Sequence, residues 1–435
     1  MALPKRFGAL FCLLSLAITT VHGQSVSIAT NDPALTILTG TKEAGGESTT
    51  GTYQSPTTTR TLATTALSSD LTSIGSNTTS ATVTYLTGTT SASKNSTTSA
   101  TAAPPKPVNT RPCNGYPEFC DRKYSNITVV GAHNSPFVRP GSAAANQQLD
   151  VTTQLNDGIR FLQAQIQWPK NGSVPHFCHS ACDLLDAGPI TEWLTEVKDW
   201  VADHPYDVVT VLLGNGNYSR PEQYVPYIES TGILRYVYTP PKIPMARDDW
   251  PTLAEMILTG QRVVMYLDYD TNQTAFPWLM DEFSQIWETP FDPIDRAFPC
   301  TVQRPPDLSP EDIRKRMYIM NHNLNVEVSL LGSSIVVPAV TQLNVTNGAT
   351  GFGSMGLAAN NCRSDWGYPP SVLNTDYYNL GSYPGSVFEV AAMINNVTYV
   401  NGTCCGSVSA APRVEMMGTL VGAGLMWSAF WMLLA

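Results

Sequence analysis

Basic residues are scarce in this sequence, and they do not cluster. Charged residues make up only 14% of the 435 residues, and the formal net charge at pH 7 is −10. A protein that binds nucleic acid needs a patch of Lys and Arg to neutralise the phosphates. The composition therefore excludes nucleic acid as an expected partner.

Cysteine motifs typical of zinc sites are also lacking. No pair of C-x-x-C motifs and no Cys/His cluster of the usual spacing occurs, so a zinc site is the weaker interpretation of the nine cysteines. Removing Cys12, which lies in the N-terminal apolar segment, leaves eight, an even number that fits disulfides in an oxidising compartment. The short spacings suggest local loops between Cys113 and Cys120 and between Cys178 and Cys182. The complete pairing stays open.

The N-terminal apolar run is too short to favour a membrane-spanning helix. Lys5 and Arg6 precede an apolar run over 7–18, and small or neutral residues follow as far as Gly23. This order is typical of a secretory signal peptide over 1–23. The alternative, an N-terminal membrane anchor, needs about 20 apolar residues.

Large apolar residues are few between positions 24 and 110. This segment is dominated by Ser, Thr, Ala and Gly, so it cannot bury enough apolar area to offset the entropy of the chain. We expect a disordered, O-glycosylated stalk, with a small β-domain as the alternative. Glycosylation sequons occur in the stalk and beyond it, at Asn77, Asn95, Asn126, Asn171, Asn217, Asn272, Asn344, Asn396 and Asn401.

The C-terminal segment, 406–435, carries no charged residue after Glu415. Small residues at 406–411 are followed by a short spacer and a terminal apolar stretch. This pattern predicts a glycosylphosphatidylinositol attachment signal, with a retained transmembrane helix as the alternative. We therefore expect a protein secreted to the extracellular side of the plasma membrane, or to the cell wall.

Between the stalk and the tail, residues 111–405 have the composition of one large domain. Apolar strand-like runs alternate with helical patterns, which predicts a parallel sheet wrapped by helices. At this length we expect a single distorted β/α TIM-type barrel, with its chemistry at the C-terminal ends of the strands, and an open doubly wound sheet is the alternative. The strand candidates are 127–130, 159–166, 208–213, 262–267 and 317–320, and the helix candidates are 143–155, 190–202, 253–258, 278–287 and 310–316.

Histidine is rare, with six residues in all, and three of them follow predicted strands. His133 comes after an apolar strand and a Gly-containing turn, where its imidazole can serve as a general base. His179 lies in the short Cys178 to Cys182 loop and can hold an acid opposite that base. The third is His322. Asp268 and Asp270 follow another predicted strand, where a turn is the favoured interpretation over a metal pair.

Three features together resemble the catalytic X region of phosphatidylinositol-specific phospholipases C. They are the strand ending in Gly-Ala-His-Asn-Ser at 131–135, the Asp-Gly-Ile-Arg-Phe segment at 157–161 and the second histidine. The resemblance covers residues 126–213. It is closest to fungal secreted members, in which the Cys-His-x-x-Cys loop, the Asn-His-Asn-Leu-Asn segment at 321–325 and the anchored tail look familiar. The resemblance implies a distorted β/α barrel.

In that family the first histidine deprotonates the inositol 2-hydroxyl, which attacks the phosphorus to give a cyclic phosphodiester. The second histidine protonates the departing diacylglycerol oxygen. Carried onto this sequence, the resemblance makes His133 the base and His179 the acid. It makes Asp376 the partner that fixes the tautomer of His133. Asn134 and Asn323, or His322 beside it, are expected to line the mouth of the barrel.

The predicted second strand lacks the charges that the resemblance calls for. Calcium-using relatives have acids there, and metal-independent ones have an Asp and an Arg, whereas this strand offers Gln163 and Gln165 as substrate-binding candidates. Arg160 is a further candidate, with a buried ion pair or backbone clamp as its favoured alternative. Asn134 supplies only one oxygen, and calcium takes about six to eight, so we expect no metal and no cofactor.

Two functions remain open from the sequence. The first is a cell-surface phosphoric diester hydrolase with a two-histidine mechanism, acting as a monomer on a phospholipid or another phosphodiester and attached to the membrane by its C-terminal anchor. The second is a catalytically inactive barrel that binds carbohydrate or cell wall. Gln163 and Gln165 distinguish the two functions. Both are uncharged, and a phosphodiester transition state needs a cation or strong donors around its negative charge.

Overall fold

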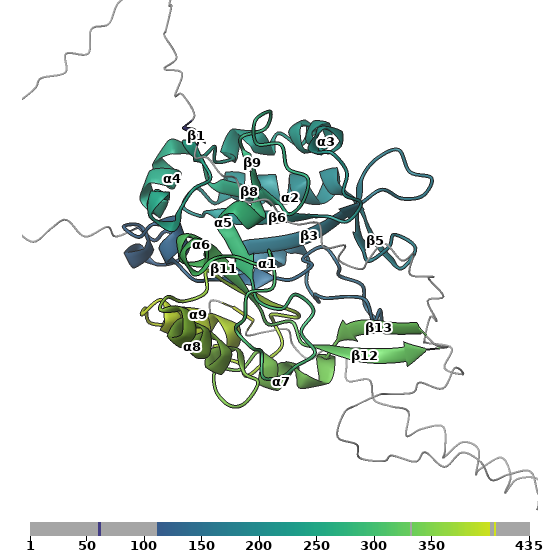
Figure 1. Ribbon diagram of the computed structural model, residues 1–435, viewed down its shortest axis with the longest axis vertical. Coiled ribbons are helices and arrows are strands. Elements are labelled where there is room, and N and C mark those ends of the chain that lie inside the picture. The colour runs from purple at the N-terminus through teal and green to yellow at the C-terminus, as the bar shows by residue number, and fades with distance from the viewer. Residues whose placement is uncertain (1–59, 62–110, 331–332, 401–403, 406–435) are drawn as a thin grey trace, which may run out of the picture.

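A computed structural model of the chain describes residues 60–61, 111–330, 333–400 and 404–405 (Figure 1). The predicted signal peptide, nearly all of the stalk and the C-terminal signal lie outside the described residues. Within the predicted stalk, β1 (Arg60–Thr61) pairs antiparallel with β7 (Lys242–Ile243). No helix in the described part of the chain is long and apolar enough to cross a bilayer.

The centre of the domain is a curled sheet of eight parallel strands (Figure 1). Across the described residues β9 and β10 do not pair, so the barrel keeps an open seam between them. The predicted distorted α/β barrel is therefore confirmed. In spatial order the strands are β10 (Ile286–Glu288), β11 (Met317–Asn321), β14 (Val372–Thr375), β2 (Val129–Ala132), β3 (Phe161–Gln167), β6 (Val209–Asn215), β8 (Val263–Leu267) and β9 (Leu279–Asp281).

Further strands and the helices surround this sheet. Two antiparallel strands, β4 (His176–His179) and β5 (Leu185–Pro189), extend from β3. A separate hairpin joins β12 (Asn325–Leu330) to β13 (Ser333–Pro338). The helices are α1 (Val151–Asp157), α2 (Ile190–Asp203), α3 (Val225–Ser230), α4 (Leu253–Thr259), α5 (Glu282–Gln285), α6 (Pro310–Lys315), α7 (Leu343–Thr346), α8 (Met355–Trp366) and α9 (Ser386–Ile394).

Local sequence explains where the helices begin and end. Asp150 begins α1 by accepting a hydrogen bond from the Thr153 N–H, and Gly158 ends it with φ at 112°. Helix α2 buries Ile190, Leu194 and Val197 against the sheet, which is the i, i+4, i+7 pattern of an amphipathic helix. These caps and faces place the loops that follow the strands.

The strand predictions are confirmed, whereas the helix predicted over 278–287 is wrong and the one predicted over 143–155 is confirmed only from Val151 onward, because 143–150 form a loop before α1. Residues 278–287 were expected to form a helix because their apolar residues recur at three- and four-residue intervals. The structure instead has β9, the single turn α5 and β10. Residues of β9 and β10 find partners on β8 and β11, as in Met265 with Leu279 and Ile286 with Met317. Pairing at the two sheet edges overrides the local periodicity.

The interior of the barrel changes from apolar to polar along the strands. Phe161, Leu212, Tyr266, Ile319 and Val372 belong to one buried cluster. Successive residues of a strand alternate between its two faces. On β3, β11, β14 and β10 the inward-facing positions nearer the C-terminal end carry the polar side chains Gln163, Asn321, Asn374 and Glu288, all buried. The polar end is the mouth where the predicted site residues lie.

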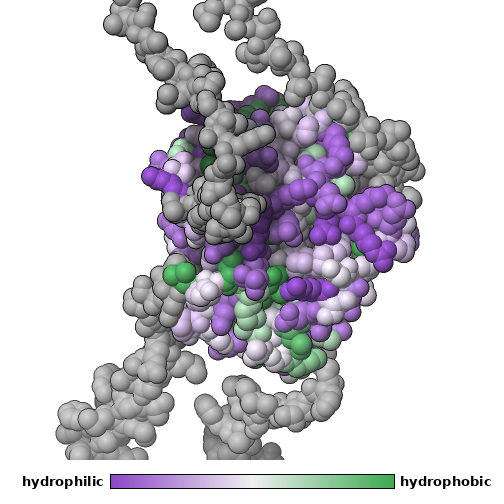
Figure 2. Space-filling model, turned by 90° about the vertical axis from the view of Figure 1, so that its left-hand side faces the viewer, coloured by the Kyte–Doolittle hydropathy of each residue, from purple (hydrophilic) through white to green (hydrophobic). Residues whose placement is uncertain are grey.

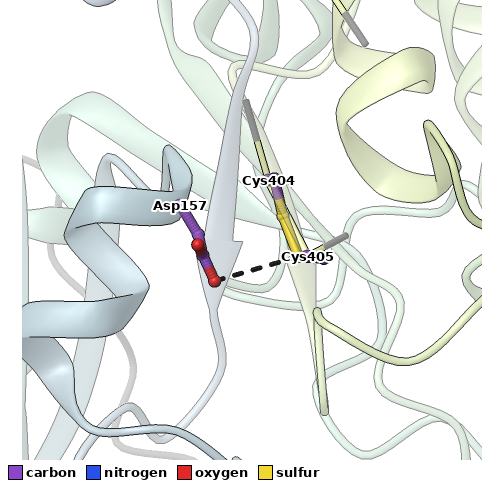
Figure 3. Close-up of side chains that lie close together, drawn as sticks. All are labelled: Asp157, Cys404 and Cys405. Carbon is purple, nitrogen blue, oxygen red and sulfur yellow. Dashed lines mark hydrogen bonds between the residues drawn. A yellow bond between two sulfur atoms is a disulfide. The ribbon is translucent and has the colours of Figure 1, made fainter. Parts of the chain in front are cut away.

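Four disulfides are present in the described residues, and both predicted local loops are confirmed: Cys113 pairs with Cys120, and Cys178 with Cys182. The others join Cys300 to Cys362 and Cys404 to Cys405. Figure 3 shows the last pair beside Asp157, whose Oδ2 lies 3.8 Å from the Cys405 sulfur. Ligand atoms of these three residues lie within 4.8 Å of one another. A metal would need free thiolates, and the disulfide removes them.

Arg160 lies just before β3, away from the mouth. Its Nη2 donates to Asp207 Oδ1 at 2.8 Å, and its Nη1 donates to the carbonyls of Leu155 and Ile159 at 2.7 and 2.8 Å. The guanidinium also stacks over Trp200, with Cζ 4.9 Å from the ring centroid. Arg160 is therefore a structural clamp that ties the end of α1 to β3, and it does not join the predicted substrate-binding residues.

We predict that Arg160→Met lowers the free energy of unfolding by about 2–4 kcal/mol, because a mostly buried Asp207 and two carbonyls lose their donor. Urea unfolding measures this change. The KM of the folded fraction for any substrate of the protein should stay at the wild-type value. A raised KM with an unchanged free energy of unfolding would show that Arg160 binds substrate and is not a structural clamp.

Candidate active site

His133 follows β2 at the mouth, and Asp376 follows the neighbouring strand β14. The register pairs Ala132 with Thr375, so the next residue of each strand lies at the same level. His133 Nδ1 is 2.7 Å from Asp376 Oδ1, and the two side chains are 5% and 2% exposed. The structure thus brings together the base and the partner that the sequence predicted.

Asn146 and Gln147 hold this pair in place, and sequence reasoning missed both. Asn146 Nδ2 donates to Asp376 Oδ1 at 2.9 Å. Gln147 Nε2 donates to the carbonyls of His133 and Thr375 at 2.8 and 3.0 Å. An ionised carboxylate only accepts, so His133 carries its proton on Nδ1 and keeps the lone pair of Nε2 for a substrate. The sequence pattern placed both in a helix over 143–155, whereas the structure has them in the loop before α1.

His179 ends β4 within the Cys178–Cys182 disulfide loop and lies near His133. Its ring packs against Phe137 at 5.1 Å between centroids. Burial, followed by the charge of His133, lowers the pKa of His179 to about 4, and a hydrogen bond to the Ala144 backbone opposes the shift. Its Nδ1 is buried without a hydrogen-bond partner among the described residues. At neutral pH the imidazole of His179 is therefore neutral.

A chain of hydrogen bonds forms the floor of the mouth. Asn374 Nδ2 donates to Gln163 Oε1 at 2.8 Å and to Asn321 Oδ1 at 3.1 Å. Asn321 Nδ2 in turn donates to Glu288 Oε2 at 2.9 Å. The predicted substrate residue Gln163 is thus 4% exposed and held by Asn374, and Gln165 lies two residues nearer the mouth on the same face of β3.

Arg304 ends this chain and supplies a positive charge that the sequence did not predict. Its Nε and Nη2 donate to Glu288 Oε2 at 3.1 and 2.7 Å, while the Glu288 backbone N–H donates to the Arg304 carbonyl at 2.7 Å. The guanidinium Cζ lies 3.8 Å from the centroid of Phe291, whose ring meets His133 edge-on at 6.3 Å. Arg304 stands in a loop at the seam, so no strand pattern pointed to it.

Carboxyl groups surround this arginine. Burial raises the pKa of Asp268 to about 6, and a hydrogen bond from the Asn215 backbone N–H opposes the shift. Burial, followed by the charge of Glu288, raises the pKa of Glu282 well above its ordinary value. Glu288 is paired with Arg304, and Asp268 and Glu282 lie around the same guanidinium, so Arg304 adds little net positive charge to the floor.

The loop after β10 brings one more carboxylate to the mouth. Asp292 is exposed as a whole residue, but the surrounding loops crowd its carboxyl group. This desolvation raises the pKa of Asp292, and electrostatic interaction with His133 and Arg304 opposes the shift. No strand or motif marked this residue in the sequence, because it belongs to an irregular loop.

The two residues predicted on the loop after β11 have different surroundings. His322 stacks on Phe298 at 3.7 Å, and its Nε2 lies 2.9 Å from the Thr346 carbonyl. Burial lowers the pKa of His322 to about 3, so it is a neutral structural residue. Asn323 is 1% exposed, and neither of its amide atoms has a partner in the described segments. The register of Asn321 with Asn374 sets Asn323 level with Asp376.

The residues around Asn134 do not fit calcium. Asn134 Nδ2 donates to Asn146 Oδ1 at 3.3 Å, and its Oδ1 has no partner among the described residues. The adjacent strand offers the amide Gln163, and Asp376 is held by His133. Calcium normally needs several carboxylates. Apart from the cluster at Asp157, the described residues contain no group of three possible metal ligands with converging ligand atoms.

Curated relatives include two proteins of Arthroderma benhamiae. One, named an uncharacterized secreted protein, is 48% identical over 424 residues, which are 95% of this chain and 94% of that protein. The other, named PI-PLC X domain-containing protein 1, is 41% identical over 271 residues and covers 62% of this chain and 86% of the relative.

Solved structures with a similar fold include bacterial phosphatidylinositol-specific phospholipases C. A variant of the Staphylococcus aureus protein matches with a TM-score of 0.41 at 13% identity, over 64% of this chain and 95% of that one. The Listeria monocytogenes protein matches with a TM-score of 0.41 at 11% identity, over 67% and 98%. The family model described as PI-PLC X 1 matches residues 119–395, more than half of this sequence. The chain therefore belongs to the PI-PLC X domain family.

Proposed function

We propose that the barrel is an extracellular phosphoric diester hydrolase that cleaves a phosphatidylinositol-like lipid. The observation that carries this proposal is the His133–Asp376 pair at the mouth, with its Nδ1–Oδ1 distance of 2.7 Å and His179 close by. Family membership supports the chemistry. The name of the 48% identical secreted relative supports the extracellular location.

The reaction begins at His133. Its Nε2 accepts the proton of the inositol 2-hydroxyl, and Asp376 stabilises the imidazolium that forms. The hydroxyl oxygen bonds to phosphorus, giving a cyclic phosphodiester, and the bond from phosphorus to the diacylglycerol oxygen breaks. His179 gives its proton to that leaving oxygen. One proton is taken and one is returned, so the step is balanced.

His179 gains its proton only when substrate is bound. In the free protein its pKa is about 4. A phosphate anion about 4 Å away, at an effective dielectric constant of about 20, stabilises the imidazolium by about 4 kcal/mol. The bound phosphate therefore raises the pKa of His179 in the complex above its value in the free protein. Substrate binding thereby favours the protonated imidazole of His179, which is the general acid of the reaction.

Neutral donors and one arginine stabilise the transition state in this proposal. The amides of Asn134, Gln165 and Asn323 lie at or beside the mouth, and the Nε2 of Gln163 faces the same interior. Arg304 contributes a fixed charge that Glu288 partly offsets. No cofactor is needed for this scheme. Attachment through a C-terminal anchor and a monomeric state are part of the same proposal and rest on the sequence.

The second candidate function is an inactive barrel that binds carbohydrate. Aromatic rings beside the mouth favour it: Trp168, directly after β3, stacks on Tyr224 at 5.9 Å with an interplanar angle of 16°. Tyr227 meets Trp168 edge-on at 6.0 Å. Trp168 and Tyr227 are half-buried while Tyr224 is buried, and the uncharged Gln163 fits a barrel that has lost its catalytic charge.

We predict that the purified full chain hydrolyses phosphatidylinositol, with equal rates with and without a chelator. His133→Ala and Asp376→Asn should each lower kcat/KM by about 10² to 10⁴, because the base or its orientation is lost. His204→Gln, which changes a histidine bonded to the Trp200 carbonyl away from the mouth, is the matched control. Absence of turnover across a panel of phosphodiesters, with the fold intact, would reject the enzyme and favour the carbohydrate-binding barrel.

The pH dependence of turnover tests whether bound substrate favours the protonated form of His179. The profile of kcat/KM reports the free protein, and that of kcat reports the complex. We predict that the alkaline limb of kcat lies at higher pH than that of kcat/KM, since bound phosphate raises the pKa of His179. In His179→Gln the limb should disappear from both profiles. Coincident limbs in the wild type would contradict this role for His179.

A further inference from the structure

Three side chains of the kinds that bind metals meet at the end of α1 (Figure 3). Asp157 is the last residue of that helix, and Cys404 and Cys405 come from the C-terminal end of the domain. Their ligand atoms lie within 4.8 Å of one another. Cys404 is buried, whereas Asp157 and Cys405 are half-buried, so solvent reaches part of the cluster. The proposed mechanism uses none of the three.

The spacing of these atoms matches an edge of a tetrahedral metal site. Zinc binds sulfur at about 2.3 Å and a carboxylate oxygen at about 2.0–2.2 Å, so two such ligands at the tetrahedral angle lie about 3.6 Å apart. The Cys405 sulfur is 3.8 Å from Asp157 Oδ2. Two thiolates on one zinc ion lie about 3.8 Å apart, a separation that neighbouring side chains reach once the bond between them is open.

A hydrogen bond from Tyr378 holds Asp157 in the orientation that a metal ligand needs. The Tyr378 hydroxyl donates to Asp157 Oδ2 at 2.6 Å, and Tyr378 is fully buried. Groups that hydrogen-bond a metal ligand from outside fix its orientation and are a regular part of metal sites. This bond does not involve the sulfurs. The carboxylate therefore keeps its orientation when the disulfide opens.

The disulfide between Cys404 and Cys405 contributes little to the stability of the fold. The two cysteines are neighbours in the sequence, whereas Cys300 and Cys362 are 62 positions apart. The stabilisation that a disulfide gives by restricting the unfolded chain grows with the length of the loop it closes. A bond between adjacent residues closes almost no loop. The domain therefore stays folded when this bond alone is reduced.

Sulfur distinguishes this cluster from the acidic surface around it. The chain has a net charge of −10, and Figure 2 shows a face of the domain that is hydrophilic over large areas. Exposed carboxylates alone do not select a metal, and hard cations such as Ca²⁺ need several of them. Thiolates select soft or borderline cations such as Zn²⁺ and Cd²⁺. The donor set of two sulfurs and one carboxylate therefore indicates which class of cation would bind.

We propose that Asp157, Cys404 and Cys405 form a binding site for zinc or a similar soft divalent cation when their disulfide is reduced. A dithiol supplies the two electrons: its own sulfurs become joined, and its two protons pass to Cys404 and Cys405. The cation then displaces these protons. Both thiolates and one oxygen of Asp157 bind it, and a water molecule completes the four-coordinate site. The oxidised pair has no thiolate to offer, so reduction controls binding.

The test measures cation binding by the full chain after mild reduction with a dithiol, which is then removed without air. Alkylation and peptide mass mapping identify preparations in which Cys404 and Cys405 are free while the other three disulfides of the described residues are intact. Calorimetry should then show one Zn²⁺ bound per chain with release of protons, and Cd²⁺ should give the ultraviolet absorption of a thiolate complex. The oxidised chain should show neither signal.

Three variants separate this site from other surface ligands. Cys404→Ser/Cys405→Ser, treated in the same way, should lack the Cd²⁺ absorption. Asp157→Asn should keep that absorption and weaken Zn²⁺ binding about tenfold or more, because one ligand loses its charge. Asp270→Asn is the matched control, since Asp270 is exposed and follows β8, whereas Asp157 precedes β3. It should bind like the wild type, and thermal unfolding verifies the fold of each variant.

Several results would overturn the site. Equal Zn²⁺ binding by the reduced wild type and the double cysteine variant is one, and wild-type affinity in Asp157→Asn is another. A bond between Cys404 and Cys405 that stays closed while the other disulfides open is a third, because the folded protein then never presents two thiolates. One cation shared by a dimer of chains is a fourth. None of these measurements uses turnover, so the metal site and the proposed hydrolase are tested independently.

Discussion

The hydrogen bond between His133 and Asp376 depends on the arrangement of the whole barrel. The two residues are 243 positions apart in the sequence, and they meet because β2 and β14 are neighbours in the sheet. Register sets both side chains at one level, and Asn146 fixes the carboxylate from a third segment. A barrel with another strand order would leave a buried carboxylate without its partner, at a cost of about 1–3 kcal/mol or more. Fold stability and the proposed chemistry therefore rely on the same contact.

The charged and polar residues at the mouth differ from those that the resemblance implied. Strand β3 presents amides, and the fixed cation, Arg304, comes from the seam between β9 and β10. Its charge is offset by Glu288, which is wholly buried. In this account His179 therefore takes up a proton from solvent when substrate binds, because the anionic diester stabilises the imidazolium.

The sequence predicted the parts of the fold that local pattern controls. Apolar runs marked β2, β3, β6, β8 and β11, and short cysteine spacings marked two disulfide loops. The segment 278–287 was misread because pairing at the seam decides its conformation. His133 could be named because it follows a predicted strand, and Asp376 because the family resemblance pointed to it. Arg304, Asp292 and Asn146 could not, since they stand in irregular loops whose positions depend on contacts across the whole domain. Arg160 was placed among the site residues although its partners, Asp207 and two carbonyls, lie at the other end of β3.

The central claim is that the His133–Asp376 pair drives an intramolecular attack on phosphorus. Phosphorus NMR of the products formed from phosphatidylinositol by the full chain tests this claim directly. The account predicts that a cyclic inositol phosphodiester accumulates first, together with diacylglycerol. Formation of an acyclic phosphomonoester as the first product, with no cyclic species at any time, would contradict it.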